Sequence, residues 1–136
     1  MKVFFDTNIF LDILLDRNHS KEALILLNSV DMGILEGYLV DISILNIDYI
    51  GKKQKKSPEI KEFLQLLIDI FNIIAPDKEI FKESLKLQNN DLEDNVQYLT
   101  AKKYKCDCII SNDKKFSFED IEILTSPEFI KKYFLH

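Results

Sequence analysis

The sequence predicts an α/β fold, a three-layer α/β/α sandwich around a parallel five-stranded sheet. Short apolar runs, typical of strands buried in a parallel sheet, alternate along the chain with longer segments of helical periodicity. Strands that alternate with helices in this way form a parallel sheet with helices on both faces. A length of 136 residues, with only three glycines and three prolines, predicts a single domain over residues 1–136.

The predicted strands are short apolar runs, and polar residues follow most of them. The first, "KVFF", is a short continuous apolar run after Lys2, as expected of a buried parallel strand, and it ends abruptly in Asp6-Thr7-Asn8. In chain order the predicted strands cover residues 2–5, 37–40, 72–75, 106–111 and 121–124.

The predicted helices are marked by apolar residues at every third or fourth position and by polar residues in their first turns. Ser20 is a predicted cap, and Ser57-Pro58 and Ser126-Pro127 each indicate a cap followed by proline at the first helical position. The predicted helices cover residues 9–15, 20–30, 43–53, 58–71, 77–87 and 127–134, and a further helix begins at 91–94. The positions predicted to face the core are Ile44, Ile47, Tyr49 or Ile50, Ile80, Ser84, Leu87, Leu92, Val96 and Leu99.

The charge of the chain limits the ways in which it binds nucleic acid. A net charge of −5 argues against binding that depends mainly on the release of counterions. Lysines nevertheless gather in two groups, and a solvated helix end is the simpler interpretation of each, although together they allow a phosphate-facing surface. The groups are Lys52, Lys53, Lys55, Lys56 and Lys61, and Lys102, Lys103 and Lys105.

Neither long apolar segment predicts a signal peptide or a membrane span. Asp6 and Asp12 interrupt the N-terminal segment. The second segment, residues 63–74, contains polar residues and is too short to cross a bilayer. We therefore expect a cytoplasmic protein.

The two cysteines, Cys106 and Cys108, are two positions apart in a predicted strand. Strand alternation then places both on one face, where they act as small apolar residues. A metal-binding pair is the weaker interpretation, because the two histidines lie far away in the sequence.

The segment "NNDLEDNVQY" places carboxylates at positions 91, 93 and 94, just before an apolar helical pattern. One interpretation is a helix start, because acidic side chains favour the positive end of the helix dipole and Asn90 with Glu93 matches a capping box. The other interpretation is that the carboxylates hold a ligand. The segment by itself favours the helix start.

Acidic residues of three segments are predicted to meet at one edge of the sheet. Asp6 ends the first strand, Asp113 follows the fourth, and the "DLED" helix leads into the fourth strand, so its N-terminus lies at the same edge. Asn46 lies in or near the first turn of the helix that leaves this edge after the second strand. Clustered carboxylates repel by roughly 1–4 kcal/mol per pair, and oxygen ligands without His or Cys suit Mg²⁺ or Mn²⁺. Together the segments favour a metal site.

These motifs resemble those of the PIN domain, the metal-dependent ribonuclease fold of VapC-like toxins in bacterial toxin–antitoxin pairs. The resemblance covers nearly the whole chain and rests on three segments, "FFDTNIFLDILLDR", "DLEDNVQYLTAKKYKCDCIISNDKKF" and "ILTSPEFI". "DTN" alone is a weak signal. Its order and spacing with an Asp-initiated helix, an apolar strand and Ser-Asn-Asp make the resemblance fairly specific.

The resemblance implies roles for the residues that match the family pattern. Asp6, Asp94 and Asp113 are the implied metal ligands, after the first strand, at the head of the late helix and after the fourth strand. Asn8 is implied to order the site beside Asp6. Ser111 falls where the family often has a hydroxyl residue near the metal or the phosphate.

Three further positions are less clearly assigned by the resemblance. Glu93 and Asp91 resemble acidic neighbours in one branch of the family, and the roles of ligand, support for a ligand and helix cap remain open for both. The family usually places a glutamate where this chain has Asn46, and neither Asp41 nor Asp48 is in the right register. An amide brings no charge, so this departure predicts weaker metal binding.

The predicted function is hydrolysis of RNA by a Mg²⁺- or Mn²⁺-dependent endoribonuclease, the toxin of a toxin–antitoxin pair. The cation would lower the pKa of a bound water, and Glu93 is a candidate to accept the water's proton. The resemblance also implies a homodimer and an antitoxin peptide that lies over the acidic cleft. The lysines that are candidates to steer the RNA backbone are Lys52, Lys53, Lys55, Lys56, Lys114 and Lys115.

Two other functions belong to different classes. A haloacid-dehalogenase-like phosphatase also has an Asp after its first strand, but it needs a second Asp two positions on, where this chain has Asn8. A PIN-fold module that binds RNA or a protein without cutting is the stronger alternative, because Asn46 removes one charge from the site. An RNA cleavage assay with and without Mn²⁺ distinguishes this module from the nuclease.

Overall fold

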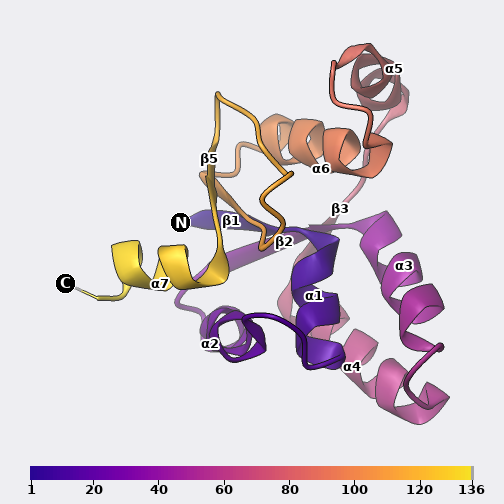
Figure 1. The fold of residues 1–136 in the computed structure, drawn as a ribbon, viewed down its shortest axis with the longest axis vertical. Helices are drawn as coiled ribbons and strands as arrows, with labels where there is room; N and C mark the ends of the chain where they lie inside the picture. The colour runs from indigo at the N-terminus through magenta and orange to yellow at the C-terminus, as the bar shows by residue number, and fades with distance from the viewer. Residues whose placement is uncertain (136) are drawn as a thin grey trace.

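A computed structural model describes residues 1–135 of the chain, and its five strands form one parallel sheet in the order β3-β2-β1-β4-β5 (Figure 1). The sheet confirms the predicted α/β fold and the predicted number of strands. β1 lies at its centre, where Phe4 pairs with Tyr38 of β2 on one side and with Ile109 of β4 on the other. The strands are β1 Lys2–Phe5, β2 Glu36–Val40, β3 Asn72–Ile74, β4 Cys108–Ile110 and β5 Glu122–Leu124.

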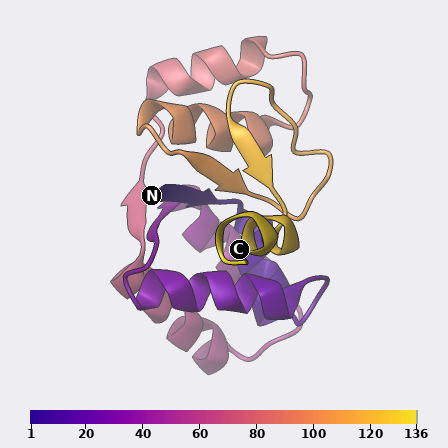
Figure 2. The ribbon, with the colours of Figure 1, turned by 90° about the vertical axis from the view of Figure 1, so that its left-hand side faces the viewer.

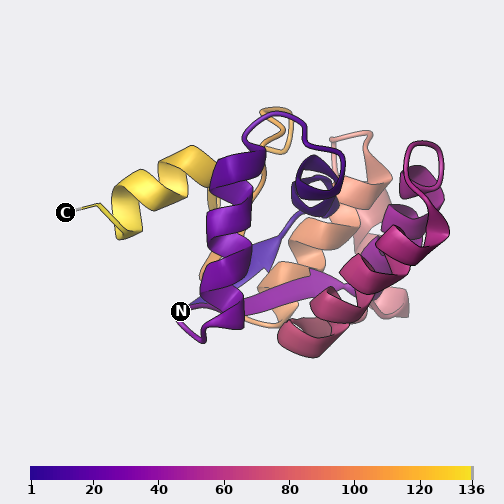
Figure 3. The same cartoon turned by 90° about the horizontal axis from the view of Figure 1, so that it is seen from below.

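Helices cover both faces of the sheet, as predicted. Figure 2 shows α5 and α6 on one face and α2, α4 and α7 on the other, so the molecule has three layers. Seen from below, α2 and the α3–α4 pair lie in front of the sheet (Figure 3). The helices are α1 Thr7–Leu14, α2 Ser20–Asp31, α3 Asp41–Gly51, α4 Ser57–Ile70, α5 Lys78–Lys86, α6 Leu92–Lys103 and α7 Ser126–Tyr133.

The chain reverses its direction of travel across the sheet after β3. β2 and then β3 are added to the sheet on one side of β1. After β3 the chain returns past β1 and adds β4 and then β5 on its other side. Right-handed crossovers in opposite directions lie on opposite faces, so α5 and α6 cover the face that α1 to α4 leave open. The switch point therefore lies between the carboxyl ends of β1 and β4, the place where ligands bind in such sheets.

The core has one hydrophobic cluster on each side of the sheet. On the side of α1 to α4, the rings of Phe5 and Phe10 both meet Phe71 edge to face, with centroids 5.0 and 5.2 Å apart. Gly37 of β2 permits this packing, because a Cβ there would lie 2.7 Å from the Phe71 ring and 2.9 Å from Val30. Aromatic packing thus fixes the central strands that carry the site.

Three predicted helix caps lie one residue too far along the chain. Ser20, Ser57 and Ser126 are the first residues of their helices, and the caps are His19, Lys56 and Thr125. At α7 the physical reason is visible: Thr125 accepts from the Glu128 backbone N–H at 3.2 Å, and the Glu128 carboxylate accepts from Thr125 N at 2.8 Å.

The prediction that Cys106 and Cys108 lie on the same face of the sheet is wrong. Cys106 precedes β4 and packs in the cluster under α6, whereas Cys108 lies in β4 and packs in the opposite cluster. The strand begins two residues later than predicted, so strand alternation does not apply to Cys106.

The predicted inward positions of the helices are confirmed in part. Ile47, Ile80, Ser84 and Val96 are buried, and Ile44, Ile50, Leu87 and Leu99 are partly buried. Tyr49 and Leu92 are instead exposed. The buried residues of α6 include polar side chains, beginning with Asp94 in its first turn.

Within residues 1–135, no helix is long and apolar enough to cross a membrane.

Candidate active site

Asp6 occupies the carboxyl end of β1, at the switch point of the sheet. Its carboxylate is almost completely buried, with 1% of the residue exposed. Gln97 Nε2 donates to one oxygen at 3.0 Å and Ser111 Oγ donates to the other at 2.9 Å. Burial raises the pKa of the Asp6 carboxyl, while these two bonds and one from the Asn8 backbone N–H act in the opposite direction. The charge of Asp113 also raises this pKa, so the sheet edge holds a buried carboxylate among several donors and close to another carboxylate.

Gln97 of α6 connects Asp6, at the end of β1, to α1 and through it to α3. This residue was not among those predicted from the sequence. Its Oε1 accepts from the Thr7 backbone N–H at 3.1 Å and from Thr7 Oγ1 at 3.3 Å. Thr7 Oγ1 and Ser43 Oγ lie 2.5 Å apart, which extends the network into α3. The available signal was spacing, because Gln97 follows Asp94 by three positions and so shares its helix face.

Asp94 lies in the first turn of α6 and is buried, with 6% of the residue exposed. Burial is the largest cause, followed in order by the charges of Asp6, Asp91, Asp113 and Glu93, and together they raise the pKa of its carboxyl from 3.8 to about 7. Side chains from β1, α6 and the loop after β4 therefore act on one carboxyl. This is the convergence of carboxylates that the sequence predicted.

Asp113 is held in the loop after β4 by the same hydroxyl that contacts Asp6. The Asp113 backbone N–H donates to Ser111 Oγ at 3.2 Å, and Asp113 Oδ1 accepts from the Lys115 backbone N–H at 2.9 Å. Ser111 is itself buried. It therefore links the two strand-end carboxylates, which is consistent with the position that the resemblance gave it.

Asn46 and Glu93 form a pair across the site. Asn46 Nδ2 donates to Glu93 Oε2 at 2.7 Å, so the second turn of α3 contacts the first turn of α6. The helix begins at Asp41, earlier than predicted, so Asn46 lies one turn beyond the predicted first turn. Burial raises the pKa of the Glu93 carboxyl and the charges of Asp6 and Asp91 add to this, whereas the Asn46 bond lowers it. The side chain at position 46 thus faces the acidic cluster, as the sequence predicted, and its amide takes a carboxylate as its partner.

Comparison with known proteins identifies the family of this chain. A model of the PIN domain matches residues 2–115 of the chain. This chain belongs to the PIN domain family. Ribonuclease VapC1 of Aquifex aeolicus (strain VF5) is 34% identical over 143 aligned positions, which cover 97% of this chain and 95% of that protein.

Two solved structures share the PIN-domain fold with this chain. VapBC2 from Rickettsia felis, bound to a DNA fragment from its promoter, has a TM-score of 0.66 at 18% identity, over 91% of this chain and 97% of that one. FitAB bound to the IR36 DNA fragment has a TM-score of 0.64 at 14% identity, over 91% of this chain and 94% of that one. At these identities the likeness supports the fold alone.

The acidic residues of this PIN domain fit the chemistry of a hard divalent cation. The donors are carboxylate oxygens, and the charges that act on Asp94 are those of four other carboxylates. Within residues 1–135, no three His, Cys, Asp or Glu side chains already stand at metal-ligand spacing.

Asp91 is the N-cap of α6. Its Oδ1 accepts from the Asp94 backbone N–H at 3.1 Å, which makes it the N-cap of the helix. The capping box considered for Asn90 and Glu93 is absent among the described residues, because the helix begins one residue later and Glu93 contacts Asn46.

Asp91→Ala is expected to lower the free energy of unfolding by about 0.5–2 kcal/mol, because the Asp94 N–H loses its acceptor. The position of Asp94 in its helix should change little, so most RNA cleavage should remain. Chemical denaturation and a cleavage assay on the same preparation measure both quantities. A variant with unchanged stability and no activity would give Asp91 a role in the site instead.

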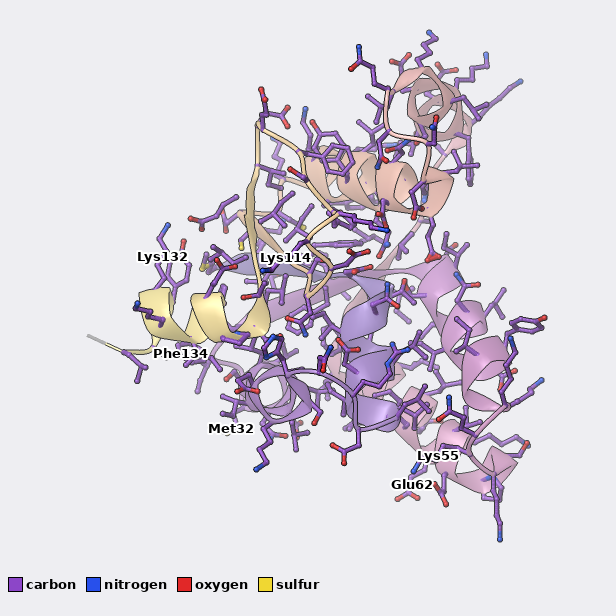
Figure 4. The ribbon with its side chains drawn as sticks, in the orientation of Figure 1. Met32, Lys55, Glu62, Lys114, Lys132 and Phe134 are labelled. Carbon is purple, nitrogen blue, oxygen red and sulfur yellow. The ribbon has the colours of Figure 1, made fainter. Side chains whose placement is uncertain are left out.

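The lysines predicted to meet RNA lie in two different places. Lys52 pairs with Asp48 at 2.9 Å and Lys53 lies over the Tyr49 ring. Figure 4 shows Lys55 at the end of the α3–α4 pair that is farthest from the sheet. Lys114 instead lines a cavity of about 580 Å³ together with Ser111 and Asp113. Of the candidate lysines, Lys114 and Lys115 thus lie beside the acidic cluster, because the Lys115 backbone N–H donates to Asp113 Oδ1 at 2.9 Å.

Proposed function

We propose that this PIN domain is a metal-dependent endoribonuclease and the toxin of a toxin–antitoxin pair. The observation that carries the proposal is the meeting of carboxylates from β1, α6 and the β4–β5 loop at the switch point of the sheet. The identity of 34% to Ribonuclease VapC1, over nearly the whole of both chains, supports the same reaction class.

The residues that would hold the cation are Asp6, Asp94 and Asp113. A bound Mg²⁺ or Mn²⁺ would lower the pKa of a water molecule and neutralise charge on the scissile phosphate. Gln97 and Ser111 keep the Asp6 carboxylate in place from opposite sides. Ser111 also fixes the loop that carries Asp113. These bonds reduce the reorganisation that the site needs when RNA binds.

Glu93 is the side chain that we assign to accept the proton from the attacking water. It is half-buried in the first turn of α6, next to Asp94 in the sequence. The bond from Asn46 fixes one of its oxygens and leaves the other available. Asn8 contributes its backbone N–H to Asp6. Lys114 would contact the RNA backbone, because it lines the same cavity as Ser111 and Asp113. Lys52, Lys53, Lys55 and Lys56 would contact only a longer RNA, because they lie at the far end of α3.

The proposed partners are RNA as substrate and an antitoxin protein as inhibitor. The VapBC2 and FitAB structures, which share this fold, are both described as bound to DNA fragments. A homodimer is part of the same proposal.

Addition of Mn²⁺ is expected to raise the melting temperature of the protein and to start cleavage of single-stranded RNA. A ligand that binds only the native state stabilises it by about 2.7 kcal/mol at a concentration one hundred times its Kd. Differential scanning calorimetry and a cleavage assay, each with EDTA as the metal-free control, measure the two effects. Absence of both effects at millimolar Mn²⁺ would exclude the nuclease.

A module that binds RNA without cutting it is the second candidate. The observation in its favour is the Asn46 amide, which stands among carboxylates without adding a charge. Such a module would bind RNA in the assay above and leave it intact at every Mn²⁺ concentration.

A further inference from the structure

A third buried carboxylate, besides those of Asp6 and Asp94, lies next to the acidic cluster and belongs to a different network. Asp12, on α1, has only 7% of its surface exposed. Its Oδ1 accepts from Arg17 Nε at 3.2 Å and its Oδ2 accepts from Asn112 Nδ2 at 3.1 Å. Asn112 Oδ1 in turn accepts from the Ser126 backbone N–H at 2.8 Å, so the network joins α1 to the start of α7. Both oxygens of Asp12 therefore have partners, as a buried carboxylate requires.

Arg17 is the only arginine in the sequence, and its side chain is held in place. The Arg17 backbone N–H donates to the Asp12 carbonyl at 2.9 Å, and its own carbonyl accepts from Ser20 N at 3.1 Å. Within residues 1–135, the guanidinium forms its hydrogen bond through Nε, and 42% of the side chain is exposed. The two terminal nitrogens therefore remain for a partner from outside the chain.

The guanidinium borders a small cavity that it shares with the acidic cluster. The cavity has a volume of about 220 Å³, less than the roughly 300–1,000 Å³ of sites for whole small molecules. Its wall carries one arginine, three asparagines and the proposed metal ligand Asp113. The lining residues are Asn8, Asp12, Arg17, Asn18, Asn112 and Asp113. A group bound there lies directly beside the proposed cleavage centre.

We propose that this cavity binds the RNA phosphate next to the scissile one, and that Arg17 is its main contact. A guanidinium matches the geometry of a phosphodiester with paired N–H groups, and amide N–H groups add further donors. Asp12 neutralises part of the arginine charge but fixes the direction in which the terminal nitrogens point. This inference rests on the proposed function, because it requires RNA to cross the acidic cluster.

The first test measures RNA binding to the metal-free protein, where no cleavage interferes. A fluorescein-labelled single-stranded RNA dodecamer is titrated by anisotropy at several salt concentrations, with wild type, Arg17→Gln and Lys21→Gln. Lys21 is the matched control, because it is exposed in the first turn of α2 and its substitution removes the same charge. One lost phosphate contact reduces the slope of log K against log salt by about 0.7 for a single strand. We expect this reduction, with about tenfold weaker binding, for Arg17→Gln only.

The second test locates the contact on the RNA. Phosphates on either side of the scissile bond are replaced one at a time by neutral methylphosphonates. Wild type should lose affinity at one neighbouring position, and Arg17→Gln should be insensitive to replacement at that same position. Arg17→Lys, which keeps the charge but loses the fork, should retain the salt slope with weaker binding. Melting curves of all variants show that the comparison is made between folded proteins.

The outcomes separate this inference from the proposed function. If wild type cleaves RNA with Mn²⁺ but Arg17→Gln binds RNA as Lys21→Gln does, the phosphate site is wrong and the nuclease stands. If wild type neither binds nor cleaves RNA, the proposed function fails and the phosphate site fails with it.

Discussion

Asp94→Asn is expected to lower the rate of metal-dependent RNA cleavage by about a hundredfold or more, because it removes one of three proposed ligands from the cation. The same substitution is expected to stabilise the metal-free protein at neutral pH. The two effects have one cause: a carboxylate that is buried among other carboxylates is unfavourable until a cation joins it. Cleavage kinetics with Mn²⁺ and thermal melting in EDTA measure them separately.

The pH dependence of the stability effect follows from the direction of the Asp94 pKa shift. The pKa of the carboxyl is 3.8 in the ordinary case and about 7 in the fold, so the native state binds the proton more tightly. Its contribution to stability is complete below about pH 4 and is lost as the pH rises through 7. Relative to wild type, Asp94→Asn should therefore gain about 1–2 kcal/mol at pH 8, after allowance for solvent screening, and little at pH 4.

Asp31→Asn is the control for this experiment. Asp31 is exposed at the end of α2, outside the acidic cluster. Its substitution removes the same charge and should change neither the cleavage rate nor the pH dependence of melting. An Asp94→Asn protein that cuts RNA at the wild-type rate would remove Asp94 from the site.

Asn46→Glu is expected to have the second largest effect. It should lower the stability of the metal-free protein and strengthen metal binding. The Asn46 amide now donates to Glu93 at 2.7 Å, and a glutamate would replace this bond by contact between two carboxylates. The metal-free protein should lose roughly 1–3 kcal/mol of stability through this repulsion. The added charge should in turn strengthen Mn²⁺ binding by about tenfold and raise cleavage when Mn²⁺ is limiting.

Isothermal titration with Mn²⁺ and melting in EDTA test both halves of this expectation. Asn46→Gln is the control, because it keeps an amide that can reach Glu93 and adds no charge. If Asn46→Glu alters neither metal affinity nor metal-free stability, position 46 does not act on the cluster and the Asn46–Glu93 contact has no energetic weight.

The strands and the layers were predictable because they depend on local patterns. "KVFF" is β1 to the residue, since three apolar residues after Lys2, followed by Asp-Thr-Asn, leave only one place for the strand to end. Helix starts were less predictable. At α7 both Thr125 and Ser126 are good caps by residue type, and the choice falls on Thr125 because Glu128 completes the reciprocal bond.

The site was predictable where the topology determines it. Asp6 and Asp113 follow strands that lie side by side, so their convergence needs only the parallel sheet. Gln97 and Asp12 were not found, because a polar residue in a helix is ordinarily taken to face water. Their burial follows from tertiary contacts with Asp6 and Asn112, which no local pattern contains.

The attachment of α6 through Gln97 has a consequence for hydrogen exchange. α5 and α6 contact each other and form a separate layer on one face of the sheet, while α1 to α4 pack on the other face. Partial opening of the α5–α6 layer would remove Asp94 and Glu93 from Asp6 and leave the other half folded. The amides of α6 should then exchange at a lower free energy than those of β1. The carboxylates of the proposed active site would then separate from one another while the rest of the domain remains folded.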